Sequence, residues 1–132
     1  MRRMLLGGVL CVLAGCGGSS PAAPSPATVA GTWRGTITNS LGSGPTPATL
    51  TLSQSGSALS GTWNLVGPDG ASTGSLSGNA IGALAAMTLT PSVATQCPYT
   101  MNTTIAGNRM TGIYASFTCS VVSSGSIDLT RQ

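Results

Sequence analysis

Few side chains in this sequence could do chemistry. It contains two carboxylic side chains, Asp69 and Asp128, and no His, Lys or Glu. General acid–base catalysis draws mainly on His, Glu, Asp and Lys, with Tyr and Cys as further candidates. Asp69 lies in a Gly-Pro-Asp-Gly sequence typical of a turn, and Asp128 lies on the polar face of a predicted strand. The many Ser and Thr hydroxyls have no His or Lys to activate them. We therefore expect a protein that is not an enzyme and that needs no cofactor.

Cys16 ends an N-terminal segment with the order of a signal peptide. Two arginines precede a short apolar run, residues 4–12, and the sequence Leu-Ala-Gly-Cys follows it. The run is too short to span a membrane as a folded helix. The tetrapeptide resembles the lipobox of bacterial lipoproteins, which implies removal of residues 1–15 and attachment of lipid, palmitate included, to Cys16. This predicts a lipid-anchored protein of the cell envelope. By analogy with bacterial lipoproteins, Gly17 in place of an aspartate implies the outer membrane, in an organism that has one. An ordinary secretory signal is the alternative.

Two further cysteines, Cys97 and Cys119, remain after removal of the N-terminal segment. Two thiols in an exported chain most often form a disulfide, because the compartments outside the cytoplasm are oxidising. Two cysteines without a histidine or a nearby carboxylate cannot supply the four ligands of a metal site. We therefore predict a Cys97–Cys119 disulfide and no metal.

Composition divides the rest of the chain into a linker and one domain. Residues 16–28 are rich in Pro, Ser, Ala and Gly without any period, which predicts a disordered linker behind the lipid anchor. Residues 29–132 have the length of one small domain. This domain carries three arginines and two aspartates, a net charge near +1 (three minus two), without a basic stripe. Nucleic-acid binding therefore has no electrostatic basis.

The clearest structural pattern is the alternation of apolar and polar residues over positions 48–63. Leucines alternate with Thr and Ser on both sides of a segment that contains glycine. Such period-2 alternation about a glycine predicts a β-hairpin. A two-residue turn at Ser55-Gly56 would place Leu52 opposite Leu59 and keep the apolar side chains on one face.

The same pattern recurs along the domain and predicts an all-β fold. Further strands are expected at residues 31–38, 72–80, 83–91, 99–106, 109–119 and 126–131, with turns at Ile81-Gly82 and Gly107-Asn108. Eight successive strands with short turns predict an eight-stranded antiparallel up-and-down β-barrel, which leaves no exposed sheet edge. A β-sandwich is the alternative. A transmembrane barrel is not expected, because the face opposite the leucines carries Thr, Ser and Asn.

The first and last strands carry a family resemblance. Gly31-Thr32-Trp33 opens the first strand, and Arg131 closes the last. In these residues the chain resembles the calycins, the group of lipocalin-like and avidin-like small barrels, and among them a compact bacterial lipocalin-like lipoprotein. The resemblance implies a structural closure in which Trp33 lies at the barrel floor under Arg131. The chain departs from the group because it is shorter than a typical lipocalin and shows no C-terminal helix.

Two functions fit such a barrel. The first is binding of a small apolar ligand in the interior. A glycine within a strand either permits the sharp coiling that closure needs or leaves room inside, and the inward glycines Gly61, Gly78 and Gly112 favour a cavity. The second is a cell-envelope protein-interaction module, or an inhibitor-like barrel, whose core is filled by side chains. The candidate ligand-lining residues, all on the predicted inner face, are Trp33, Leu50, Leu52, Leu59, Trp63, Leu76, Met87, Met101 and Tyr114, with Leu89, Ile105 and Met110 beside them.

The predicted strand over residues 109–119 breaks the two-face pattern. With Met110 facing inward, Ile113 and Phe117 face outward. Either a β-bulge turns Phe117 into the core and brings Cys119 toward its partner, or Ile113 and Phe117 form a surface for a protein partner. The bulge is the favoured prediction of the two.

Overall fold

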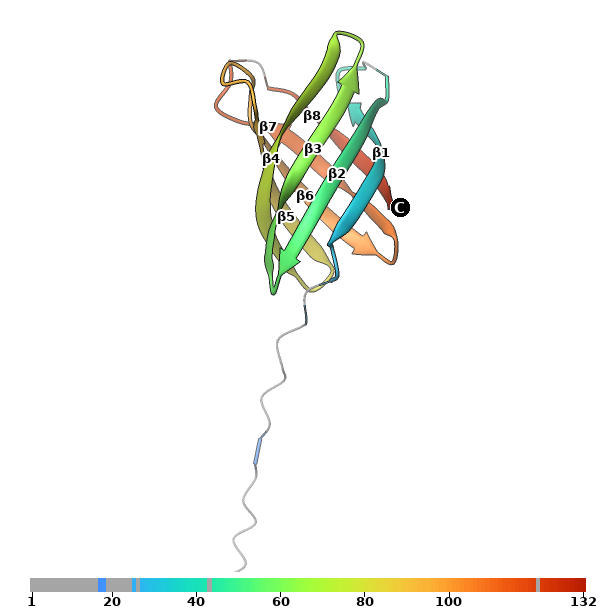
Figure 1. The fold of residues 1–132 in the computed structure, drawn as a ribbon, viewed down its shortest axis with the longest axis vertical. Coiled ribbons are helices and arrows are strands. Elements are labelled where there is room, and N and C mark those ends of the chain that lie inside the picture. Colours follow the sequence, from blue (N-terminus) through green and yellow to red (C-terminus); the bar gives the residue numbers. More distant parts are fainter. Residues whose placement is uncertain (1–16, 19–24, 26, 43, 121) are drawn as a thin grey trace, which may run out of the picture.

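Eight strands pair in sequence order around a closed sheet. The computed structural model describes residues 17–18, 25, 27–42, 44–120 and 122–132. Its strands are β1 (Gly31–Asn39), β2 (Thr46–Ser55), β3 (Ala58–Gly67), β4 (Gly70–Ile81), β5 (Leu84–Pro91), β6 (Tyr99–Ala106), β7 (Arg109–Ser116) and β8 (Ser124–Arg131). Each strand pairs antiparallel with the next, and β8 pairs with β1 (Figure 1). The predicted eight-stranded up-and-down barrel is confirmed, and a β-sandwich is excluded.

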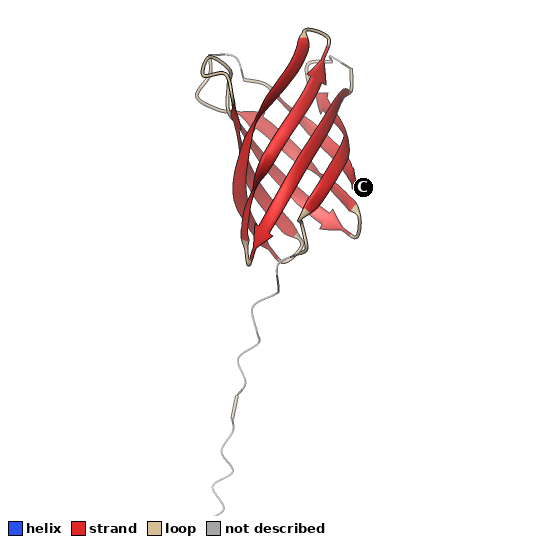
Figure 2. Ribbon diagram, in the orientation of Figure 1, coloured by secondary structure: helices blue, strands red, loops and turns tan. Residues whose placement is uncertain are grey.

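Every regular element in the described part of the chain is a strand (Figure 2). These residues include no helix with the length and apolar character needed to cross a membrane. Residues 1–15 of the predicted signal peptide, the predicted lipid site Cys16 and most of the predicted linker lie outside the described residues.

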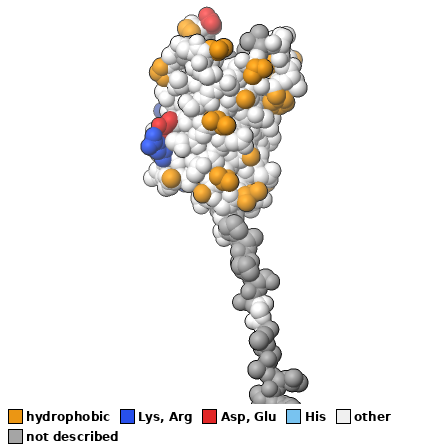
Figure 3. Space-filling view, turned by 180° about the vertical axis from the view of Figure 1, so that it is seen from behind, with side chains coloured by type: hydrophobic (Ala, Val, Ile, Leu, Met, Phe, Trp, Pro, Cys, Tyr) orange, Lys and Arg blue, Asp and Glu red, His pale blue; other side chains and the backbone are white. Residues whose placement is uncertain are grey.

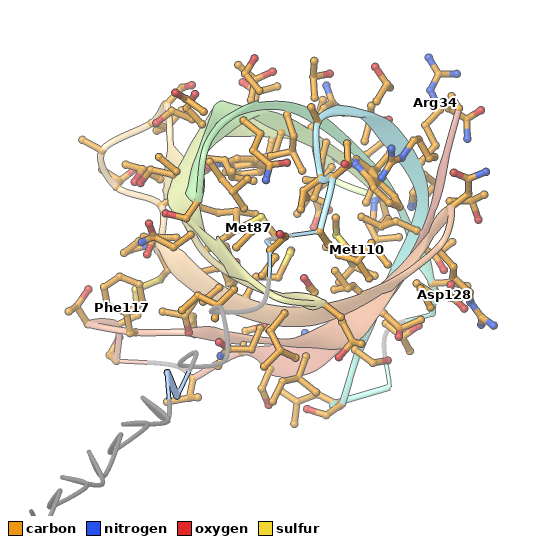
Figure 4. All side chains as sticks on the ribbon, turned by 90° about the horizontal axis from the view of Figure 1, so that it is seen from below. Arg34, Met87, Met110, Phe117 and Asp128 are labelled. Carbon is orange, nitrogen blue, oxygen red and sulfur yellow. A yellow bond between two sulfur atoms is a disulfide. The ribbon has the colours of Figure 1, made fainter. Side chains whose placement is uncertain are left out.

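Alternation along the strands produces the core. All the predicted inner-face residues are buried, whereas the outward positions are mainly Ser, Thr and Asn. A view along the barrel shows Met87 and Met110 inside the ring of strands, and Arg34 and Asp128 outside it (Figure 4). Burial of one such apolar side chain contributes about 1.5–3 kcal/mol. The inner face therefore supplies most of the driving force for folding, and the outer face suits water.

Two hairpin turns lie one residue later than predicted. Gly56 and Gly82, with φ angles of 60° and 57°, occupy the first of the two turn positions instead of the second. A type II′ turn needs a positive φ at that first position, which glycine adopts without strain. The change shifts the register by two residues, so that Leu52 lies opposite Gly61 instead of Leu59. Because the side-chain period is two, every residue stays on its predicted face.

The inward glycines bring neighbouring strands close together. A Cβ atom added to Gly61 would lie 2.0 Å from the carbonyl oxygen of Thr51. One added to Gly78 or Gly112 would lie 2.1 Å from a carbonyl oxygen of the neighbouring strand. The sheet coils strongly at these positions, as closure of a small barrel requires. These glycines therefore serve closure, which corrects the expectation that they open an interior cavity.

β7 runs to Ser116 without a bulge. It pairs residue by residue with β6, in the predicted register with Met101 opposite Tyr114, and with β8 on its other side. Beyond the strand, the chain turns out of the sheet at Thr118, whose φ is 61°. Phe117 lies outside the barrel and is 39% exposed (Figure 4), so the predicted bulge is wrong.

Candidate functional site

One end of the barrel is closed around Trp33. This indole is fully buried, and its Nε1 donates a hydrogen bond to the carbonyl oxygen of Val29 at 2.8 Å. The guanidinium carbon of Arg131 lies 4.6 Å from the centroid of the Trp33 ring. The negative face of an indole attracts a cation, and more strongly where water is excluded. The same guanidinium donates a hydrogen bond to the carbonyl oxygen of Thr28. Arg131 thus covers the tryptophan at the floor of the barrel.

The segment before β1 completes this floor. Val29 is fully buried, and its N–H donates to Oε1 of Gln54 at 2.7 Å. Nε2 of Gln54 donates in turn to the carbonyl oxygen of Ala27 at 2.9 Å. The N–H of Ala27 donates to the carbonyl oxygen of Gly82, in the β4–β5 turn, at 2.6 Å. The chain therefore enters the barrel beside the β4–β5 turn, at the closed end (Figure 1).

The opposite end carries the disulfide. Cys97 and Cys119 are bonded, with their Cα atoms 6.0 Å apart, which confirms the predicted pair. The two cysteines lie in the β5–β6 and β7–β8 connections, beyond the ends of the paired strands, so the bond needs no bulge. The N–H of Phe117 also donates to the carbonyl oxygen of Pro98 at 3.2 Å. These contacts join two long connections at this end of the barrel.

A cavity of about 130 Å³ opens at this second end. Its walls are mainly apolar, with a few uncharged polar groups. A cavity of this size holds a ring about as large as benzene, whereas sites for drug-sized ligands have roughly 300 Å³ or more. The lining residues are Ile37, Asn39, Thr46, Leu65, Leu89, Tyr99, Met101, Tyr114 and Ser123.

The structure separates the candidate ligand-lining residues into two groups. Met101 and Tyr114 line the cavity. The other seven lie deeper, in a core filled by side chains, and none of them lines the cavity. Trp63, for example, packs across Gly74, where an added Cβ would lie 2.7 Å from the indole nitrogen. The interior therefore consists of a solid core next to the floor and a small cavity at the open end.

Hydrogen bonds hold the polar edge of the cavity. Nδ2 of Asn39 donates to Oγ of Ser123 at 2.9 Å, and Oδ1 of Asn39 accepts from the N–H of Leu41 at 2.8 Å. The N–H of Ser123 donates to Oγ of Ser116 at 2.7 Å. Asn39 thereby ties the β1–β2 connection to the β7–β8 connection beside the cavity.

The two tyrosines of the chain meet in one wall of the cavity. The rings of Tyr99 and Tyr114 pack edge to face, with their centroids 5.9 Å apart. Burial raises the pKa of Tyr114 above its ordinary value, and a hydrogen bond with Ser123 opposes this effect. The Tyr114 hydroxyl is therefore neutral at physiological pH. Since the lining contains no acidic or basic side chain, the cavity presents a neutral surface.

The carboxylates lie away from the cavity. Asp128, on the outside of β8, forms a two-pronged ion pair with Arg109, with Nε···Oδ1 at 2.9 Å and Nη2···Oδ2 at 2.5 Å. Hydrogen bonding from Arg109 lowers the pKa of Asp128. Asp69 lies in the β3–β4 turn. Among the described residues, no group of three or more His, Cys, Asp or Glu side chains is placed to hold a metal ion.

The sequence pattern contained a signal for most of the cavity walls. Extending the two-residue period of inward positions toward the open end of the strands selects Asn39, Thr46, Leu65 and Tyr99. These positions look like ordinary core or strand ends in the sequence, because nothing local shows that the space between them stays unfilled. Ser123 lies in a connection and has no such signal.

Comparisons with models of known protein families and with curated proteins found no match to this chain.

Proposed function

We propose that this protein is an exported, lipid-anchored, non-enzymatic barrel that binds a small, neutral, apolar group in the cavity at its open end. The observation that carries the proposal is the cavity itself, about 130 Å³ in volume with apolar walls. An apolar group that enters it leaves water, which stabilises the complex by about 25 cal/mol for each Å² of apolar surface buried.

The edge of the cavity restricts the chemistry of the ligand. Asn39, Tyr114 and Ser123 offer neutral hydrogen-bonding groups to one polar atom of a ligand. A charged group placed there would lose its hydration without gaining an opposite charge. The ligand class that fits is a compact ring or chain end with one uncharged polar group.

The lipid anchor is supported by the lipobox-like sequence that ends at Cys16. The closed end of the barrel adds a geometric argument, because the chain between the anchor and β1 reaches the barrel there (Figure 1). An anchored barrel of this kind holds its open end away from the membrane, where a ligand can enter from water.

A protein-interaction role is the second candidate. It is favoured by Ile113, which is 64% exposed on β7 and borders a shallow apolar groove on the outer face. Phe117, the other residue proposed for a partner, does not line that groove.

Benzyl alcohol is a suitable probe, because it combines a benzene ring with one hydroxyl group. We expect saturable amide chemical-shift changes at residues around the cavity, with a Kd on the order of 1 mM, equivalent to about −4 kcal/mol. Thr46→Trp places a large side chain in the cavity and should abolish these changes. Thr51→Trp, on the outer face of the same strand, is the matched control and should preserve them.

Benzoate, which has the same ring and a negative charge, should bind far more weakly than benzyl alcohol. Two results would contradict the proposal. One is benzyl alcohol binding that persists in Thr46→Trp, and the other is equal affinity for benzyl alcohol and benzoate.

A further inference from the structure

Large apolar side chains are exposed at both ends of the barrel, and those on the outside of its closed end lie along one groove. Ile81 and Leu84, which are 68% and 60% exposed, flank the β4–β5 turn. A shallow groove extends from them past Ala86 to Ile113 on β7. We call these four residues the apolar strip. Figure 3 shows hydrophobic side chains on the lower part of the visible face, next to the point where the chain leaves the barrel, and also on its upper part. Ser and Thr dominate most other outward positions of the strands.

The apolar strip begins where the chain leaves the barrel. The N–H of Ala27 donates to the carbonyl oxygen of Gly82, which lies between Ile81 and Leu84 in sequence. Ala27 lies eleven positions (27 minus 16) after Cys16 in the sequence. Even when fully extended, this segment spans at most about 40 Å. A lipid on Cys16 therefore keeps the β4–β5 turn within that distance of a bilayer.

The charged side chains also differ between the two ends of the barrel. Arg34, Arg109 and Arg131 lie in the closed-end halves of their strands together with Asp128, a net charge of +2 (three minus one). Asp69 lies in the β3–β4 turn at the opposite end. Arg34 and Asp128 both project from the outer surface (Figure 4). An anionic bilayer therefore attracts the closed end of the barrel and repels the end with the cavity.

We infer that the apolar strip rests on the surface of a lipid bilayer, with the β4–β5 turn in the headgroup region and the cavity facing water. This inference rests on the lipid anchor of the proposed function. The lipid on Cys16 attaches the chain to the membrane, and the strip, together with the net positive charge of the closed end, orients the barrel.

The test places a nitroxide spin label on Leu84→Cys in the full lipidated protein, reconstituted in phosphatidylcholine vesicles that contain phosphatidylglycerol. The disulfide occupies Cys97 and Cys119, and the lipid occupies Cys16, so the introduced thiol is the one that reacts. Val66→Cys is the matched control, because Val66 is 52% exposed near the β3–β4 turn at the opposite end. Relaxation by oxygen, which concentrates in lipid, is compared with relaxation by a water-soluble nickel chelate.

We expect the Leu84 label to respond more to oxygen, and several-fold less to the nickel chelate, than the Val66 label. Ile81→Cys gives a second position with the same expectation should Leu84→Cys fail to fold. Equal, water-like accessibility at both ends, with lipid on Cys16 shown by mass spectrometry, overturns the inference while the anchor stands, and leaves the strip to a protein partner. A mass spectrum without lipid on Cys16 overturns the anchor itself, and the inference with it.

Discussion

Trp33 is held by residues from both ends of the domain. Val29, before β1, accepts the hydrogen bond of its indole, and Arg131, at the end of β8, covers its ring. Arg131 is half-buried, and its Nε has no hydrogen-bond partner among the described residues. A buried, unpaired N–H is unfavourable. The contact with the indole and the hydrogen bond to Thr28 must therefore outweigh it.

Replacement of Arg131 tests this closure. Arg131→Gln removes the cation above the ring, and we expect the free energy of unfolding to fall by about 1–2 kcal/mol. Arg34→Gln, at an exposed position on β1, is the control and should change it by less than about 0.5 kcal/mol. Urea titrations of both variants measure the difference. Equal midpoints for the two variants would contradict the role given to Arg131.

The ion pair of Asp128 predicts a pH dependence of stability. Hydrogen bonding from Arg109 lowers the pKa of Asp128 in the folded protein. A group with a lowered folded-state pKa contributes stability above its unfolded-state pKa, about 3.9 for aspartate, and loses it as pH falls through the folded-state pKa. Wild type should therefore lose more stability than Asp128→Asn on acidification from pH 6 to below about pH 3.

Arg109→Gln provides the second arm of this experiment, because it removes the partner and keeps the carboxylate. It should reduce the same acid-dependent loss. Since both side chains are exposed, added salt should weaken the effect in wild type. Identical pH profiles for wild type and both variants would show that the pair does not affect folding.

At the scale of the elements, glycines decide how the strands meet. Gly56 sets the register of the β2–β3 hairpin through its positive φ, and Gly82 does the same for β4–β5. Gly61 acts differently, since its backbone conformation is ordinary and the neighbouring strand occupies the space of a side chain. Strong coiling at such points allows eight short strands to close around a core of this width.

Gly61→Ala tests the close approach of β2 and β3. Its Cβ would meet the carbonyl oxygen of Thr51, so the strands must separate, and we expect a loss of about 2–3 kcal/mol in the free energy of unfolding. Gly67→Ala is the matched control, because its Cβ would lie 3.7 Å from the carbonyl oxygen of Gly70, an ordinary contact. That variant should be unchanged or more stable by about 0.5 kcal/mol. Denaturant titrations of both proteins decide the matter, and equal stability would refute the proposed steric limit.

At the scale of the whole molecule, the two ends of the barrel differ in kind. The closed end combines a filled core, the arginines, the apolar strip and the point where the chain enters. The other end combines the cavity with connections that are joined by a disulfide and hydrogen bonds. This difference between the ends suits a barrel that is attached to a surface at one end and opens to water at the other.

The lipid anchor is tested by metabolic labelling with palmitate. Cys16→Ala should abolish incorporation, because the tetrapeptide at residues 13–16 would lose the thiol that we propose receives the lipid. Cys11→Ala changes a cysteine inside the predicted signal peptide and should leave incorporation intact. Undiminished labelling of Cys16→Ala would exclude this residue as the lipid site.

The strand order, the face of each residue within the paired strands and the Cys97–Cys119 pair could all be predicted from the sequence, whereas the position of Phe117 could not. Each of these predictions rests on local information or simple chemistry: a two-residue period, turn residues between periods, and two thiols remaining in a chain with a predicted export signal. The packing of Arg131 over Trp33 was expected on other grounds, because the resemblance to the calycins implied it.

The tertiary structure alone decided the register of two hairpins, the end of β7 and the size of the cavity. The register depends on which turn position takes the positive φ, and the end of β7 depends on the turn at Thr118. The cavity depends on the volume that remains after the side chains of all eight strands have packed. Gly61 and Trp63 show why the volume cannot be predicted from one strand. The neighbouring strand occupies the space beside Gly61, and Trp63 packs across Gly74 on the facing strand. No strand by itself contains that information, because the volume is a property of the closed barrel.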